Sequence, residues 1–290
     1  IVTGSRDYDD AARIEGLSPW NTKLYAHNSE WVSIAMNDDG EAQGFRLGLE
    51  GRNYLVPDIQ DSVLSGVAHI GTSYGPKYSW SSFYNWEADF FNIQNNTITH
   101  FRDSDVSAGV YTADICMNSG VKNTTVMNNV VNNCAVGIQF ERTAYSFYHS
   151  RSEWGADGAI IEGNTFHDTE YLDVWFYLNS YADNVTVRNN EFTGSSAPGY
   201  NVYTQDRTTI GLVVDDNTFS NGQEPIYMRG GLDWEITDNT IYGDGDASHI
   251  GIATRNGYGI IDGNTLIDAD GGILVDQITA NQVVNITNND

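Results

Sequence analysis

One short pattern of apolar and polar positions recurs through most of the chain. It consists of an apolar residue, two mostly polar residues, asparagine, any residue and a second apolar residue, as in Ile93 to Ile98. The asparagines of the pattern are Asn96, Asn129, Asn164, Asn190, Asn217, Asn239, Asn264 and Asn289, spaced 33, 35, 26, 27, 22, 25 and 25 residues apart. Eight copies at this spacing indicate a repeat fold in which each copy is one structural unit.

The residues of each repeat favour short strands joined by bends. Gly, Asn, Asp, Thr and Val dominate, which disfavours helix, and the leucine pattern of leucine-rich repeats is absent. Asparagine tolerates left-handed backbone and bonds neighbouring peptide groups, so it suits the bend between two apolar positions. If the turns of chain stack as coils, equivalent residues lie about 4.8 Å apart. The pattern therefore predicts an all-β parallel β-helix of about 8–10 coils with a hydrogen-bonded asparagine ladder.

The repeated Ile-x-x-Asn-x-Ile bends and the Gly-Ile strands that follow them, such as Gly251-Ile252, resemble the right-handed parallel β-helix repeat proteins, the pectin-lyase-like superfamily. The resemblance covers roughly Leu55 to Asp290. It implies a single-stranded right-handed parallel β-helix. Members include polysaccharide lyases, glycoside hydrolases, epimerases, phage tailspikes, adhesins and a copper-maturation family, and no catalytic signature of one enzyme family is recognisable here.

The chain reads as one continuous domain. We expect the β-helix over residues 51–290 and an N-terminal cap or irregular first coil over residues 1–50, where the motif is missing. Ile59 to Leu64 looks like a degenerate copy of the motif, in which position 62 lies 34 residues before Asn96. Two long aromatic insertions are predicted near 66–86 and 142–158, and long loops on a repeat fold are usually functional or form interfaces.

Charge excludes two classes of partner. The chain has 14 Lys and Arg against 39 Asp and Glu, a net charge of −25. Such a surface repels nucleic acid and anionic membranes. The sequence contains no run of 18 apolar residues, so no segment is predicted to insert into a bilayer. Because the chain begins at Ile1 without Met, we expect a trimmed piece of an exported protein, extracellular or at the cell surface. Cys116 and Cys134 are either a disulfide or two small core residues.

A second strand follows each bend, and its alternation predicts which side chains face outward. Aligned segments run from Gly109, Gly137, Asp173, Asn201, Pro225, Gly251 and Gly272, with the third and fifth residues outward. The third-position row is Tyr111, Gln139, Trp175, Tyr203, Tyr227, Ala253 and Leu274. The fifth-position row is Ala113, Glu141, Tyr177, Gln205, Arg229, Arg255 and Asp276.

An exposed aromatic row indicates a binding surface. Aromatic rings beside hydrogen-bonding groups suit sugars, and a sheet with sites every 4.8 Å or so suits an extended glycan. The predicted substrate-binding residues are Tyr111, Gln139, Trp175, Tyr177, Tyr203, Gln205, Tyr227, Arg229 and Arg255, with Trp154 from the second insertion. The alternative is that insertions or a partner subunit cover these aromatics as ordinary packing, and a slip of one residue would exchange the two faces.

Cleavage of a glycan requires a proton donor with a second carboxylate, or a base that abstracts a proton. Glu141 is the first candidate for the acid because aromatic neighbours would raise its pKa. The other carboxylates on or beside the outward rows are Asp114, Asp173 and Asp206, and Arg142 and His149 are candidates for a lyase base. A solvated surface is the alternative for each of them.

Two acidic turns are candidates for a metal site. Asp244 and Asp246 follow one bend, Asp268 and Asp270 follow the next, and stacking would bring the four carboxylates close together. Calcium prefers such oxygen ligands, although solvated turns are the alternative. No organic cofactor is predicted.

These patterns predict an exported polysaccharide-active protein that binds an extended glycan on its outer sheet and cleaves it as a glycoside hydrolase or a lyase. The alternative is a non-catalytic surface protein, such as an adhesin, fibre or surface-layer module. Either class is compatible with a homo-oligomer or a lattice.

Overall fold

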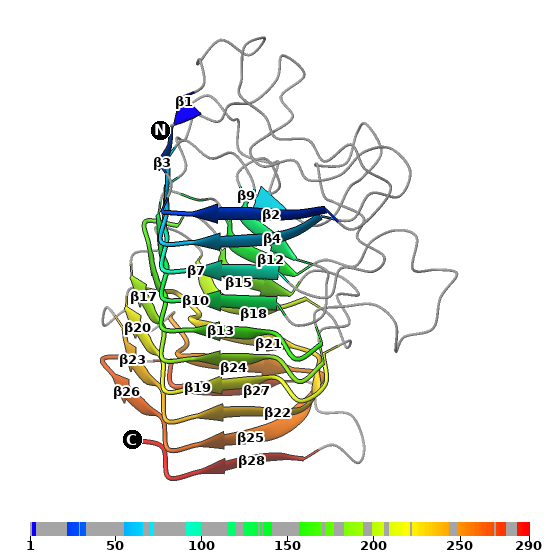
Figure 1. Cartoon of the computed structure of the whole chain (residues 1–290). Helices are drawn as coiled ribbons and strands as arrows, with labels where there is room; N and C mark the ends of the chain where they lie inside the picture. Colours follow the sequence, from blue (N-terminus) through cyan, green and yellow to red (C-terminus); the bar gives the residue numbers. More distant parts are fainter. Residues whose placement is uncertain are drawn as a thin grey trace, which may run out of the picture.

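The computed structural model describes residues 2–3, 22–28, 30–32, 55–65, 70–71, 91–99, 115–119, 124–132, 134, 136–140, 157–169, 172–176, 183–193, 199–205, 209–220, 222–243, 249–269, 271–276 and 283–290. All regular elements in these ranges are β-strands. They form three sheets of ten, ten and eight strands. Most turns of the chain contribute one strand to each sheet, and successive turns stack in one direction (Figure 1). The predicted parallel β-helix is confirmed, with ten stacked turns.

Each sheet takes its strands from successive coils, in the order of the sequence. The first sheet holds β2 (Thr22–His27), β4 (Leu55–Gln60), β7 (Phe91–Gln94), β10 (Thr124–Met127), β13 (Ile160–Glu162), β16 (Thr186–Arg188), β19 (Val213–Asp215), β22 (Leu232–Thr237), β25 (Tyr258–Asp262) and β28 (Val284–Thr287). The second sheet holds β1 (Val2–Thr3), β3 (Glu30–Val32), β5 (Val63–Ser65), β8 (Thr97–Thr99), β11 (Val130–Asn132), β14 (Thr165–His167), β17 (Glu191–Thr193), β20 (Thr218–Ser220), β23 (Thr240–Tyr242) and β26 (Thr265–Ile267). The third sheet holds β6 (Ile70–Gly71), β9 (Ile115–Ser119), β12 (Val136–Phe140), β15 (Leu172–Phe176), β18 (Tyr200–Thr204), β21 (Ile226–Arg229), β24 (Ile252–Arg255) and β27 (Ile273–Asp276).

Strand pairing crosses the boundary that the sequence predicts near residue 50. Strand β2 pairs with β4 in the first sheet, and β3 pairs with β5 in the second, both in parallel. The described strands of the first 50 residues therefore extend the same sheets.

The core lies inside the coils, where alternate residues of all three sheets meet. Val174, Val202 and Ile226 of the third sheet are fully buried, as are Ile161 and Val187 of the first sheet and Phe166 and Phe192 of the second. Large rings stack along the axis because equivalent positions repeat in register: Phe166 lies 5.2 Å from Phe192, and Phe192 lies 4.8 Å from Phe219, between ring centroids. Burial of these stacks stabilises contacts between neighbouring coils.

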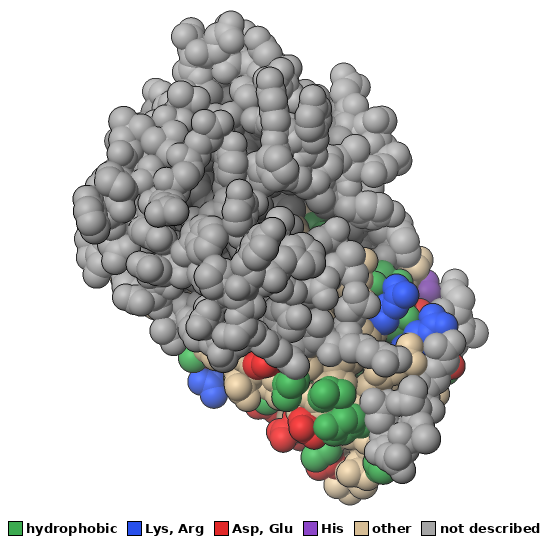
Figure 2. Space-filling view, turned by 90° about the vertical axis from the view of Figure 1, so that its right-hand side faces the viewer, with side chains coloured by type: hydrophobic (Ala, Val, Ile, Leu, Met, Phe, Trp, Pro, Cys, Tyr) green, Lys and Arg blue, Asp and Glu red, His purple; other side chains and the backbone are tan. Residues whose placement is uncertain are grey.

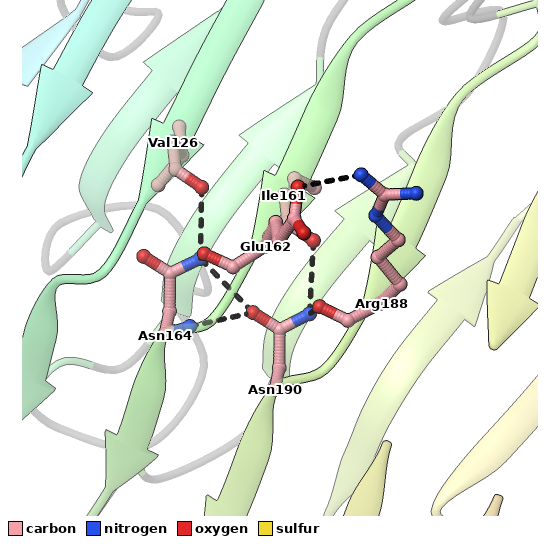
Figure 3. A network of polar contacts seen from close by, with 6 residues as sticks. All are labelled: Val126, Ile161, Glu162, Asn164, Arg188 and Asn190. Carbon is pink, nitrogen blue, oxygen red and sulfur yellow. Dashed lines mark hydrogen bonds and ion pairs between the residues drawn. The ribbon is translucent and has the colours of Figure 1, made fainter. Parts of the chain in front are cut away.

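The asparagine ladder is confirmed for all eight predicted residues. In each step, the backbone N–H and the side-chain amide of one asparagine donate to the side-chain oxygen of the next, as from Asn164 to Asn190 at 2.9 Å for both bonds (Figure 3). The same amide also donates to a backbone carbonyl of the preceding coil, as Asn190 does to Ile161 at 2.9 Å. Ser62 of the degenerate copy joins the ladder, because its N–H donates to Asn96 Oδ1 at 2.9 Å. The ladder satisfies buried polar groups at every bend.

The left-handed residue of each bend is not the ladder asparagine. It is the residue immediately before, such as Asn189 with φ 54° or Asp238 with φ 53°. Asn, Asp and Gly occupy this position because they adopt positive φ most readily. The ladder residue instead donates its backbone N–H to the asparagine of the next coil. The positive φ and the ladder hydrogen bonds of each bend therefore belong to two adjacent residues.

Replacing Gly259 by alanine should destabilise the fold by about 3 kcal/mol, near the upper end of costs for overpacked cores. A β-carbon at Gly259 would lie 2.0 Å from the Trp234 carbonyl oxygen and 2.5 Å from its indole ring, and Trp234 is fully buried. Urea unfolding followed by circular dichroism measures the loss. Ile260→Ala, an exposed position of the same strand, is the control and should change stability by less than about 0.5 kcal/mol. Equal stability of both variants would contradict the prediction.

Candidate functional site

The outer face of the third sheet was predicted to carry the site, and its register is as expected from Gln139 onward. Gln139 pairs with Trp175, Trp175 with Tyr203, and Tyr203 with Tyr227. The row continues through Ala253 and Leu274. The inward positions between them are buried through β24 and half-buried in β27, where Leu274 is exposed, so the predicted faces are correct for these coils.

The prediction was wrong for the coil that precedes Gln139. The strand paired with β12 is β9, residues 115–119, and Asn118 lies opposite Gln139. The predicted strand 109–113 and its Tyr111 lie outside the described residues. Because Asn118 and not Tyr111 is the partner of Gln139, the sequence alignment placed this strand seven residues too early.

The upper part of the row is packed rather than exposed. Gln139 and Trp175 are 1% and 5% exposed. Trp175 forms an apolar cluster on the outer face with Val136 and Leu172, which occupy equivalent positions at the start of their strands. For Gln139 and Trp175, the alternative of covered packing therefore describes the structure better than an open groove.

The accessible aromatic part lies one coil further on, in what we call the tyrosine cluster: Tyr200, Tyr203 and Tyr227. Ring centroids are 4.8 Å apart for Tyr200 and Tyr203, and 5.5 Å for Tyr203 and Tyr227. Tyr200 also reaches Tyr227 at 5.3 Å in a tilted arrangement. All three are half-buried. Because the rings cover one another's faces, the cluster offers ring edges and phenolic hydroxyls to a ligand as well as apolar surface.

Acidic and basic groups flank the tyrosine cluster. Glu224 directly precedes Pro225 and acts on the Tyr200 hydroxyl through its charge. Burial raises the pKa of the half-buried Glu224 carboxyl. Burial, and then the charge of Glu224, raise the pKa of Tyr200 to about 12, while Arg229 opposes this rise. The Tyr200 hydroxyl therefore stays protonated and can donate a hydrogen bond at any physiological pH.

Sequence reasoning missed Tyr200 and Glu224. Both lie one residue before the segments that the sequence assigned to the strands, at Asn201 and Pro225. Strand β18 begins at Tyr200. Extending each predicted strand by one residue at its start would have included both Tyr200 and Glu224.

The predicted basic and amide residues at the ends of these strands lie where expected. Arg229 is exposed, Gln205 is half-buried, and Arg255 Nε lies 3.5 Å from Asp276 Oδ2. Arg229 and Arg255 are direct partners in adjacent strands. In the space-filling view, two cationic side chains lie next to each other beside hydrophobic side chains (Figure 2).

Asp173, a predicted catalytic carboxylate, is the second residue of β15 and is buried, with 1% exposure. Thr169 Oγ1 donates to its Oδ1 at 2.5 Å, and Asn201 Nδ2 lies 2.5 Å from its Oδ2. Burial raises its pKa from 3.8 to about 7, against the lowering effect of these two contacts. A side chain in this position cannot touch a glycan on the outer face, so Asp173 is a structural group beneath it.

The remaining predicted site residues lie outside the described residues: Glu141, Asp114, Asp206, Arg142 and His149 among the catalytic candidates, Tyr111, Tyr177 and Trp154 among the binding candidates, and Asp244, Asp246 and Asp270 of the calcium turns. Asp268 is exposed and has φ 54°. Within the described ranges, no group of three or more His, Cys, Asp or Glu could hold a metal. The calcium site stays a prediction.

Two further features bear on the setting of the site. Cys134 is disulfide-bonded, and Cys116 is the only other cysteine of the chain. A shallow polar groove of about 400 Å³ runs along the bends between the first and second sheets, where Asn164, Asn190, Glu191 and Asp216 contribute to its lining. This groove adjoins the asparagine ladder, at the corner between the first and second sheets and away from the third sheet.

No helix in the described part of the chain is long and apolar enough to cross a membrane.

Comparison with known proteins identifies the fold. Residues 174–290 match the family described as "Right handed beta helix region". The crystal structure of the Dettilon tailspike protein (gp208) resembles this one with 13% sequence identity and a TM-score of 0.39. The match covers 96% of this chain and 58% of the tailspike chain. The chain thus spans little more than half the length of that protein. No curated protein matches the sequence. Because the coils before residue 174 continue the same three sheets as the matched region, the described structure is one right-handed parallel β-helix.

Proposed function

We propose that this protein is an exported glycan-binding β-helix whose ligand lies across the tyrosine cluster on the outer face of the third sheet. The carrying observation is the mutual stacking of Tyr200, Tyr203 and Tyr227 at an accessible surface, within 5.5 Å of one another. Half-buried aromatic rings with polar tips suit a ligand that is partly apolar and partly hydroxylated, as a sugar ring is.

Position and chemistry around the cluster support the proposal. The strands of the third sheet repeat the same outward positions coil after coil, about 4.8 Å apart, so an extended chain can follow the axis. Glu224 and Gln205 flank the rings with hydrogen-bonding groups suited to sugar hydroxyls. The disulfide at Cys134 supports an oxidising, extracellular setting.

Cleavage of the bound glycan is the finer part of the proposal. Its acid–base residues would come from Glu141, Asp114, Asp206, Arg142 and His149. Incubation with neutral and uronate polysaccharides, followed by assays of reducing ends and of unsaturated products, tests it. Turnover that Glu141→Gln abolishes while binding persists would assign the acid. Binding without any product would leave a non-catalytic surface protein.

Tyr203→Ala and Tyr227→Ala should each weaken glycan binding by about 1–2 kcal/mol, close to a tenfold loss of affinity, because each removes ring surface at the centre of the cluster. Affinity electrophoresis or calorimetry against the polysaccharide panel measures the change. Tyr242→Ala is the matched control, since Tyr242 is an exposed tyrosine on the second sheet. If the control and the cluster variants lose the same affinity, the ligand does not lie on the tyrosine cluster.

A further inference from the structure

One carboxyl group, that of Glu224, lies at the edge of the tyrosine cluster. Glu224 is two residues before Ile226, which pairs with Val202 of the preceding coil. Tyr200 is two residues before Val202, so Glu224 and Tyr200 occupy equivalent positions in adjacent coils. Both side chains are half-buried, and the charge of Glu224 acts on the Tyr200 hydroxyl. The carboxyl group is therefore next to a ring of the cluster and open to a ligand that lies over it.

The neighbours of Glu224 offer its carboxyl group no partner. Pro225, the next residue, has no N–H to donate. In the following coil the N–H of Ile250 donates to the Gln223 carbonyl at 2.9 Å, so an isoleucine occupies the equivalent position there. Within the described part of the chain, neither a hydrogen-bond donor nor a cation acts on the Glu224 carboxyl, and burial alone raises its pKa. Such a group keeps its proton more readily than an exposed carboxyl does.

Other ionisable groups surround the cluster without changing this balance. Tyr203, Tyr227 and Arg229 act on the Tyr200 hydroxyl, and His249 precedes Ile250 in the following coil. None of these described groups contributes to the raised pKa of Glu224. A sugar over the rings would exclude more water from the carboxyl group, which favours the protonated form further.

A carboxyl group that keeps its proton beside a bound sugar suits one reaction in particular. Hydrolysis of a glycosidic bond begins with proton donation to the leaving oxygen, and a carboxylic acid with a raised pKa is the usual donor. A lyase acts instead beside the carboxylate of a uronate, which a second carboxyl group would repel. The position of Glu224 therefore favours hydrolysis.

Resting on the proposed function, we infer that Glu224 is the proton donor in hydrolysis of the glycan that lies on the tyrosine cluster. Its proton passes to the glycosidic oxygen, and the bond from that oxygen to the anomeric carbon breaks with both electrons going to the oxygen. A water molecule forms the new bond to the anomeric carbon. The proton that this water releases goes to a second carboxylate, for which Glu141, Asp114 and Asp206 are the candidates, and solvent returns a proton to Glu224.

Glu224→Gln keeps the shape of the side chain and removes its acidic proton. On the polysaccharide that the parent hydrolyses, we expect turnover to fall by about 10²–10⁴-fold while affinity for the glycan is unchanged. A dinitrophenyl glycoside of the same sugars needs no proton donor, because its leaving group departs as a stable anion, so the variant should hydrolyse it at close to the parent rate. The parent should lose activity as the pH rises and Glu224 ionises, and the residual activity of the variant should lack this loss. Glu235→Gln, at an exposed glutamate of the first sheet, is the control and should match the parent in every assay.

The outcomes separate the proton donor from the glycan site. Parent-like turnover in Glu224→Gln, an equal loss on both substrates, or unsaturated products from the parent would overturn the inference, as would Glu141→Gln being the variant that spares the dinitrophenyl glycoside. Binding by the parent without any product would overturn it too, and the glycan site would stand. Absence of binding to any glycan, together with no effect of the tyrosine variants, would remove the proposed function itself.

Discussion

Asn190→Ala is expected to lower the free energy of unfolding by about 4 kcal/mol, because two or more buried groups lose their partners and each costs about 1–3 kcal/mol. Asn190 Oδ1 accepts from the backbone N–H and the side-chain amide of Asn164. Its own amide donates to the carbonyl oxygens of Ile161 and Arg188, both at 2.9 Å, and to Asn217 Oδ1 at 3.0 Å. Alanine supplies none of these contacts.

The effect should be local before it is global, because each coil contacts only its neighbours. Hydrogen exchange is therefore the sharpest measurement: the amide of Asn164, which loses its acceptor, should lose protection first, followed by neighbouring coils. Denaturant unfolding gives the overall change.

Asn189→Gly is the matched control for this prediction. Asn189 is exposed, precedes Asn190 directly and has φ 54°, which glycine adopts without strain. Its stability should stay within about 0.5 kcal/mol of the parent protein, as for most surface substitutions. If Asn190→Ala proved as mild as this control, the ladder would contribute nothing beyond the turn itself.

The sequence was sufficient to predict the ladder because the ladder has a strict chemical requirement. Only a side chain with both an acceptor and a donor can take the N–H of one coil and bond the carbonyl of another, so asparagine recurs at each bend. Ser62 shows the limit of the rule, since a serine occupies the asparagine position there: its backbone N–H donates to Asn96 Oδ1, and its hydroxyl donates to the Gln60 carbonyl. The positions that repeat in the sequence are those that every coil needs.

The exposure of outward residues could not be predicted in the same way. Alternation places Trp175 and Tyr203 on the same face, yet Trp175 is 5% exposed and Tyr203 is half-buried. Their neighbours differ: Val136 and Leu172 form a buried apolar cluster with Trp175, whereas Tyr203 and Tyr200 pack at the edge of that cluster. A period of two specifies the face, whereas burial on that face depends on which side chains stack beside it.

The direction of Asp173 depended on a local irregularity. Leu172 pairs with Val136 and Val174 with Ile138, while Asp173 and Gly137, which lie between them inside β15 and β12, are skipped in the pairing of the two strands. A β-carbon at Gly137 would lie 2.7 Å from the Asp173 carbonyl oxygen and from the Phe166 ring, so the two strands are tightly packed at this point. A strict alternation assigns Asp173 beside the outer row, whereas this irregularity buries its side chain.

Asp173→Asn is expected to make the protein more stable than its parent at pH 8, and the advantage should vanish near pH 4. In the folded state the pKa of Asp173 is about 7, against 3.8 for an ordinary aspartate. Below pH 3.8 both states are protonated and the group has no effect. Between 3.8 and about 7 the unfolded state loses its proton first, so the stability of the parent falls as the pH rises. A shift of about three units corresponds to roughly 4 kcal/mol in total.

The contacts around Asp173 explain why the neutral form fits. The side-chain oxygen of Asn201 is buried and, among the described residues, has no hydrogen-bond partner. The 2.5 Å between the Asn201 amide and Asp173 Oδ2 is shorter than a usual N–H···O bond and ordinary for O–H···O. Turning over the Asn201 amide lets a protonated Asp173 donate to that oxygen. An asparagine at position 173 makes the same donation at every pH.

Denaturant unfolding of the parent and Asp173→Asn at pH 4, 6 and 8 measures the difference directly. Comparison at each pH removes the contribution of other carboxylates, such as Asp262, whose pKa is lowered by bonds from Thr287 and Asn288 and which favours folding as the pH rises. Asp276→Asn, at an exposed carboxylate, is the control and should show no comparable dependence. Infrared absorption of a protonated carboxylic acid at pH 6 that the variant lacks should accompany the effect. A stability difference that is constant from pH 4 to pH 8 would mean that the pKa of Asp173 is the same in the folded and unfolded states, in spite of its burial.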